Sequence, residues 1–122
     1  MKKFISILVL VLGFAGMSIA QTEVANSKGS KELAASKSSG TYSFVLPSRV
    51  SQDDIDKNMK YYKLYMDAAF NANSHEVVLT LSENSQKNRY VVARFLTALK
   101  VTHVKVDGEN MVMDAFIKKY LE

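Results

Sequence analysis

The polar residues with the clearest chemical potential follow two of the expected strands. Arg49 and Ser51 come shortly after a strand-like segment that ends at Leu46, and Asn84 and Ser85 come shortly after Leu81. In a parallel sheet, ligands bind outside the carboxyl ends of the strands, where helix N-termini present free N–H groups. An arginine beside two helix N-termini could hold a small anion or a partner's carboxylate. Arg49, Ser51, Asn84 and Ser85 are therefore candidate ligand-binding residues.

Helix capping explains the same positions without a ligand. The side chains of Ser51, Ser82 or Asn84, and Asp107 are suited to accept hydrogen bonds from the free N–H groups of a helix N-terminus. Glu83 and Asp107 also place negative charge where the anion would lie. The sequence therefore favours capping at these positions, with ligand binding as the alternative.

A second candidate surface is aromatic. Residues 51–71 are predicted to form one helix, because apolar side chains recur there at intervals of three and four residues (Ile55, Met59, Tyr62, Met66 and Ala69/Phe70). Tyr61 and Tyr65 lie beside this stripe, four residues apart. Exposed tyrosines make good anchors for a protein interface or a sugar, although packing against the sheet with the hydroxyls at the rim is favoured. Tyr61 and Tyr65 are the candidate interaction residues.

Catalytic and metal-binding signatures are missing from the sequence. It contains no glycine-rich nucleotide loop, no H-E-x-x-H and no G-x-S-x-G. The absence of cysteine excludes disulfides, thiolate catalysis and cysteine-ligated metals. Met59 and Met66 fit a core better than a copper site that would also use His75 and His103. The chain is therefore more consistent with a non-catalytic protein, and we expect no cofactor.

These residues must be positioned by a small α/β domain. Strands are expected near residues 42–46, 75–81 and 101–107, and helices over 51–71, 82–100 and the C-terminal end. Residues 111–113 fit either a short strand or the start of the last helix. This order predicts a mainly parallel sheet of three to four strands with three helices. The strand–loop–helix opening is shared with heavy-metal-associated domains of the ferredoxin-like type. Because their paired cysteines are absent from residues 46–52 and a different later order is expected, no relationship is inferred.

The N-terminal region is predicted to lie outside this domain. Met1-Lys2-Lys3, an apolar run from Phe4 to Phe14, and small residues at positions 18 and 20 form the pattern of a secretory signal peptide over residues 1–20. Residues 21–40 are rich in Ser, Lys and Gly and are predicted to form a flexible linker. The folded domain is then expected to span residues 41–122.

The net charge of the chain and its predicted export limit the classes of partner that we expect. Without Lys2 and Lys3, 14 basic and 12 acidic side chains remain, with no run of basic residues, so a nucleic-acid partner is not expected. We expect an exported, periplasmic or secreted, non-catalytic binding or protein-interaction module with an envelope or extracellular protein partner. No stable membrane anchor is expected after signal cleavage. The alternative is a small-ligand or anion binder, or an enzyme, that uses the loops at the carboxyl ends of the strands. The sequence does not predict the oligomeric state.

Overall fold

The computed structural model describes residues 23–122, so the predicted signal peptide and its cleavage site at Gln21 lie outside the described residues. The described chain is a mixed α/β fold whose buried apolar side chains form a single core, which extends from Ala25 to Leu121. None of the described helices combines the length and apolar character that crossing a membrane requires.

Six strands in residues 23–122 form one sheet: β1 (Val24–Asn26), β2 (Thr41–Val45), β3 (Met66–Asn71), β4 (Glu76–Leu81), β5 (His103–Val106) and β6 (Glu109–Val112). Their order across the sheet is β3-β4-β2-β1-β5-β6. Only β1 and β5 pair in parallel, and the other four neighbouring pairs are antiparallel. The α/β class is confirmed, but the prediction of a mainly parallel sheet with three to four strands is wrong.

The main cause of this difference is the segment predicted as the second half of a long helix. Residues 66–71 form strand β3, which pairs with β4 from Met66 opposite Leu81 to Asn71 opposite Glu76. The two strands are joined by a tight turn, in which the Asn71 side chain accepts hydrogen bonds from the N–H groups of Asn73 and Ser74. Because so short a connection can only join antiparallel neighbours, the expected crossover is replaced by a hairpin.

Four helices lie in the described part of the chain: α2 (Ser30–Ser39), α3 (Gln52–Met59), α4 (Gln86–Ala98) and α5 (Met113–Phe116). A π-helical turn, η1 (Ile117–Leu121), continues α5 to the end of the chain. Residues 109–112 return as β6 after a turn in which Asp107 and Gly108 both have positive φ, as a two-residue hairpin loop requires. The ambiguity at residues 111–113 is thus resolved, with α5 beginning at Met113.

Residues 24–40 belong to the fold, so the predicted flexible linker is wrong there. Strand β1 lies between β2 and β5, and the side chains of Ala25 and Leu33 are buried. Helix α2 begins after Gly29, which has no side chain to cap it, and the Asp107 carboxylate accepts a hydrogen bond from the Ser30 N–H at 3.1 Å instead. Hydrogen bonding from the Ser30 side chain, together with this bond from its N–H, holds the pKa of Asp107 below its usual value. Contacts distant in sequence therefore order a segment whose composition resembles a linker.

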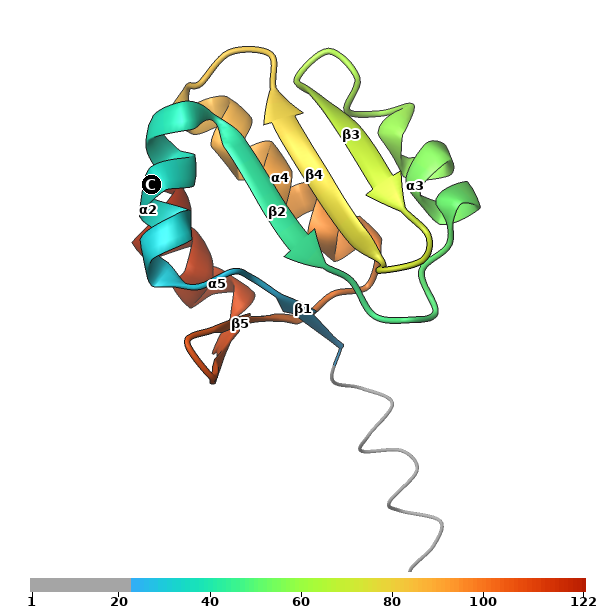
Figure 1. Cartoon of the computed structure of the whole chain (residues 1–122). Helices are drawn as coiled ribbons and strands as arrows, with labels where there is room; N and C mark the ends of the chain where they lie inside the picture. The colour runs from blue at the N-terminus through green and yellow to red at the C-terminus, as the bar shows by residue number, and fades with distance from the viewer. Residues whose placement is uncertain (1–22) are drawn as a thin grey trace, which may run out of the picture.

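One face of the sheet carries the core. Alternate residues of β2 and β4 (Tyr42, Phe44, Val77 and Leu79) are buried there, against Phe95 of α4 and Phe116 of α5. In Figure 1, α4 lies behind β2 and β4, whereas no helix lies in front of the opposite face of β4 and β3. The chain from β2 to β5 follows the β-α-β-β-α-β order of the split βαβ motif, so the expected difference from that order is wrong. Strand β1 is inserted between β2 and β5.

Candidate functional site

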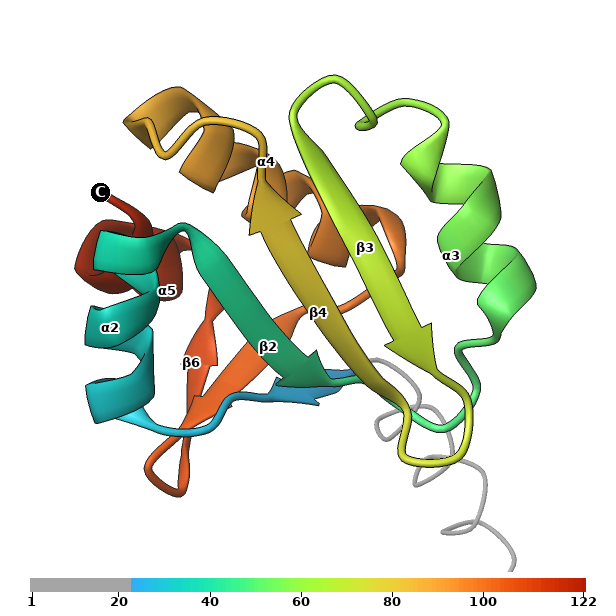
Figure 2. The same ribbon diagram turned by 45° about the horizontal axis from the view of Figure 1, so that its top comes forward.

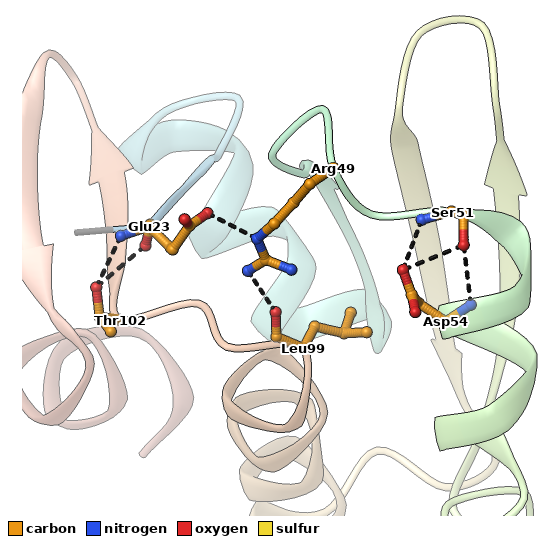
Figure 3. Close-up of polar contacts among 6 residues, drawn as sticks. All are labelled: Glu23, Arg49, Ser51, Asp54, Leu99 and Thr102. Carbon is orange, nitrogen blue, oxygen red and sulfur yellow. Dashed lines mark hydrogen bonds and ion pairs between the residues drawn. The ribbon is translucent and has the colours of Figure 1, made fainter. Parts of the chain in front are cut away.

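Arg49 lies where the chain leaves β2, and its guanidinium joins two other segments. Its Nε donates to Glu23 Oε1 at 3.0 Å, and its Nη2 donates to the carbonyl oxygen of Leu99 at 2.7 Å (Figure 3). The Leu99 carbonyl belongs to the C-terminal end of α4, where a cation is favourable. Arg49 therefore fastens the start of the described chain to the end of α4, and two of its nitrogen atoms, Nε and Nη2, already donate hydrogen bonds within the chain.

Ser51 caps α3. Its Oγ accepts a hydrogen bond from the Asp54 N–H at 3.2 Å, while its own N–H donates to Asp54 Oδ2 at 2.9 Å (Figure 3). This reciprocal pair is a capping box, and the hydrogen bonds from Ser51 lower the pKa of Asp54. The capping role expected for Ser51 is confirmed.

Asn84 and Ser85 are likewise engaged within the chain. The Ser85 side chain caps α4 by accepting from the Asn88 N–H at 3.2 Å. Asn84 Nδ2 donates to the carbonyl oxygens of Lys37 and Ser38, at the C-terminal end of α2. Asn84 therefore hydrogen-bonds free carbonyl groups at the C-terminal end of α2. The sequence analysis had offered it as one possible cap for the N-terminus of α4.

The structure does not bring the four candidate ligand residues together. Strands β2 and β4 are antiparallel, so their carboxyl ends lie at opposite ends of the sheet, as the opposed arrows in Figure 1 show. Arg49 and Ser51 follow β2, whereas Asn84 and Ser85 follow β4. The shared edge on which the anion site was inferred depended on a parallel sheet, and that premise is wrong.

The candidate tyrosines lie in a turn rather than on a helix, because α3 ends at Met59. Tyr61 is 75% exposed. Tyr65 is half-buried against the core, with the Lys87 ammonium 5.9 Å from its ring centroid. Tyr62, between them, packs edge-on against Phe95. The structure therefore exposes Tyr61 and only partly exposes Tyr65.

Sequence reasoning missed a groove between α4 and the C-terminal helices, which we call the α4–α5 groove. It has a volume of about 790 Å³, within the range of about 300–1,000 Å³ typical of ligand pockets. Its apolar lining comes mainly from Tyr62, Ala93, Ala98, Met113 and Ile117. The available signal was a second stripe on α4, at residues 90, 93/94 and 97/98, beside the buried stripe that contains Val92, Phe95 and Leu96.

The charges of the α4–α5 groove are arranged around its apolar lining. Tyr90 Oη donates to Glu122 Oε2 at 2.9 Å, which pairs the start of α4 with the end of η1. Arg94 and Lys118, each four residues away from this pair in the sequence, also line the groove. Within residues 23–122, neither cation has a carboxylate within 4 Å. The groove is therefore lined by two cations that form no ion pair among the described residues, and by the carboxylates of Asp114 and Glu122.

Residues 23–122 contain no cluster of three or more His, Asp or Glu side chains that could hold a metal ion. Met59 and Met66 are buried in the core. No family model, curated protein or solved structure matches this chain. The site must therefore be judged from its geometry alone.

Proposed function

We propose that this protein is an exported, non-catalytic protein-interaction module and that the α4–α5 groove is its contact surface. The observation that carries the proposal is the groove itself, a mostly apolar concavity beside α4 and the C-terminal helices, whose two lining cations form no ion pair within residues 23–122. An apolar groove between helices suits the apolar face of a partner segment, most commonly a helix. Arg94 and Lys118 then favour a partner with acidic side chains beside its apolar face.

The alternative surface at the strand ends has less support. The polar atoms of Arg49, Ser51 and Asn84 already serve hydrogen bonds that hold the chain together. A ligand that used Nε and Nη2 of Arg49 would have to displace Glu23 and the Leu99 carbonyl. Replacing these bonds leaves little net free energy for binding, because each lost partner must be compensated.

The test compares two double variants that change the net charge equally. Arg94→Glu/Lys118→Glu reverses the cations of the groove, and Lys31→Glu/Lys105→Glu reverses two exposed cations on α2 and β5. The chain without residues 1–20 is immobilised, and proteins of its own envelope fraction are captured, identified and titrated. Since surface substitutions usually change stability by about 0.5 kcal/mol or less, both variants should stay folded.

We expect the groove variant to lose a specific partner by about tenfold or more in affinity, which is about 1.4 kcal/mol. The α2/β5 variant should retain it, apart from a modest change in association rate. Equal capture by both variants and the unmodified protein would contradict the assignment of the groove.

A further inference from the structure

The segment that joins α3 to β3 has an unusual composition. Residues 57–65 contain Lys57, Lys60 and Lys63, three tyrosines and Leu64, and no acidic residue. Lysines interleaved with aromatic and large aliphatic residues are typical of segments that bind the interface of a membrane. The structure shows which of these side chains are available.

Hydrogen bonds fix the backbone of this segment. The N–H groups of Tyr61 and Tyr65 donate to the carbonyl oxygens of Asn58 and Tyr62. The Ser82 hydroxyl, from the other side of the β3–β4 hairpin, contacts the carbonyl oxygens of Leu64 and Tyr65 at 3.0 and 3.1 Å. The turn is therefore held in one shape before any contact with a partner.

This shape separates the apolar side chains into two sets. Tyr62 and Tyr65 pack against the core, whereas Tyr61 and Leu64 are 75% and 83% exposed. Among the described residues, these are the two most exposed large hydrophobic side chains, followed by Val112 at 52%. Exposing both within one fixed turn costs hydrophobic free energy in water, which contact with an apolar phase would recover.

The charge around the exposed pair is positive. Lys60 and Lys63 are exposed and take part in no ion pair of residues 23–122, while Lys57 pairs with Asp53 at 3.3 Å. The nearest carboxylates along the chain, Asp56 of α3 on one side and Asp67 and Glu83 at the base of the turn on the other, all lie outside residues 57–65. The exposed apolar pair is thus bordered by two lysines without ion-pair partners.

We propose that residues 60–64 dock this protein reversibly on an anionic phospholipid bilayer, with Leu64 and the Tyr61 ring at the headgroup boundary and Lys60 and Lys63 on the headgroups. Tyrosine suits this boundary because its ring is apolar and its hydroxyl is polar. Lysine stems cover apolar surface while their ammonium groups reach the lipid phosphates. This inference goes beyond the proposed protein partner and does not depend on the α4–α5 groove.

Sedimentation with lipid vesicles tests the proposal directly. The chain without residues 1–20 is mixed with vesicles of phosphatidylglycerol and phosphatidylcholine, or of phosphatidylcholine alone, at low and high salt. We expect binding to the anionic vesicles, little binding to the zwitterionic ones, and release at high salt, because headgroup attraction is screened. Tyr61→Ser/Leu64→Ser and Lys60→Glu/Lys63→Glu should each lower the partition coefficient about tenfold or more.

Matched controls distinguish binding through this surface from non-specific adsorption to vesicles. Val112→Ser removes the exposed apolar side chain of β6, and Lys31→Glu/Lys105→Glu changes the charge as Lys60→Glu/Lys63→Glu does. Both controls should bind vesicles as the unmodified chain does, apart from the smaller effect of net charge, and circular dichroism should show all variants folded. The proposal is overturned if anionic vesicles are not bound, if phosphatidylcholine is bound equally, or if the turn variants match the controls. Self-association through Tyr61 and Leu64 without vesicle binding would also overturn it, and would leave the groove proposal intact.

Discussion

Replacing Leu33 by alanine should destabilise the whole domain, although Leu33 lies in the segment whose composition predicts a linker. Leu33 is 2% exposed and is the buried side chain of α2. Leu→Ala at a buried site costs about 2–5 kcal/mol, the sum of the lost transfer free energy and the cavity left behind. We expect about 3 kcal/mol, toward the lower half of that range, because α2 lies at the border of the core and can partly relax onto it.

A loss of this size is large for a small domain. Typical unfolding free energies are about 5–15 kcal/mol, and each kcal/mol shifts the Tm of a domain of 60–100 residues by about 4–8 °C. The Tm should therefore fall by roughly 12–24 °C. Urea unfolding should give a lower midpoint with an unchanged slope, since the same surface is exposed on unfolding.

The control is Lys31→Ala, which changes an exposed residue of the same helix. It should change the unfolding free energy by about 0.5 kcal/mol or less. If Leu33→Ala also costs less than about 1 kcal/mol, α2 is not docked on the core and the linker interpretation was right after all.

Three further predictions concern the core, the start of α2 and the response to acid. Phe95→Ala should cost about 3–5 kcal/mol in urea unfolding, because the Phe95 ring is fully buried and contacts Tyr62; a loss under about 1 kcal/mol would refute this. Gly29→Ala should lower the Tm, since its φ is +112° and a Cβ would lie 2.9 Å from the Asp107 carboxylate; an unchanged Tm would exclude this close approach. The hydrogen bond from Ser30 lowers the folded-state pKa of Asp107, so its stabilisation is full above the unfolded-state pKa and is lost as the pH falls through the folded-state pKa. Asp107→Asn should therefore flatten the acid side of the stability–pH curve, and an unchanged curve would contradict this.

The raised pKa of Tyr42 predicts a loss of stability at high pH. Burial raises this pKa to about 12, and the Tyr42 hydroxyl lies 3.4 Å from the Tyr120 carbonyl oxygen. The unfolded chain therefore releases this proton first, so stability should fall as the pH rises from about 10 to about 12. Tyr42→Phe should show a smaller fall over this interval in thermal unfolding, and an equal fall would contradict the assignment.

The elements that the sequence predicted correctly are those with strong local signals. The strand expected near residues 75–81 and the helix expected within residues 82–100 are confirmed as β4 and α4, and α4 buries an apolar stripe that includes Phe95 and Leu96. The capping serine of α3 is also confirmed, because Ser51 and Asp54 form their hydrogen bonds within four residues. Local patterns of this kind do not depend on how the strands pair.

The errors came from segments whose structure depends on pairing with another part of the chain. Residues 66–71 (Met-Asp-Ala-Ala-Phe-Asn) continue the helical spacing of α3, but pairing with β4 makes them a strand. In the same way, β1 and α2 are ordered by strands β2 and β5 and by the carboxylate of Asp107, more than 75 residues away in the chain. The contacts of β1 with β5 and of α2 with Asp107 have no signal within a window of ten to fifteen residues, whereas the β3–β4 hairpin is local but its first strand also fits the helical spacing.

The prediction of one ligand site at the strand ends failed for the same reason. With β2 and β4 antiparallel, Arg49 and Asn84 lie at opposite ends of the sheet, so the inferred shared edge does not exist. The α4–α5 groove forms only where α4 meets Met113 and Ile117, and this contact required the hairpin of β5 and β6. Tyr61 was the one candidate whose expected exposure is clearly present.

Site-specific photo-cross-linking tests the central claim, that the α4–α5 groove is the protein-contact surface, most directly. A photoreactive amino acid at Thr97, an exposed residue of the groove, is compared in the source cells with the same group at Ser43, on the opposite face of the sheet. The account predicts a discrete protein adduct from position 97 that disappears with Arg94→Glu/Lys118→Glu, and no matching adduct from position 43. An adduct from position 43 alone, or one from position 97 that survives the charge reversal, would contradict it.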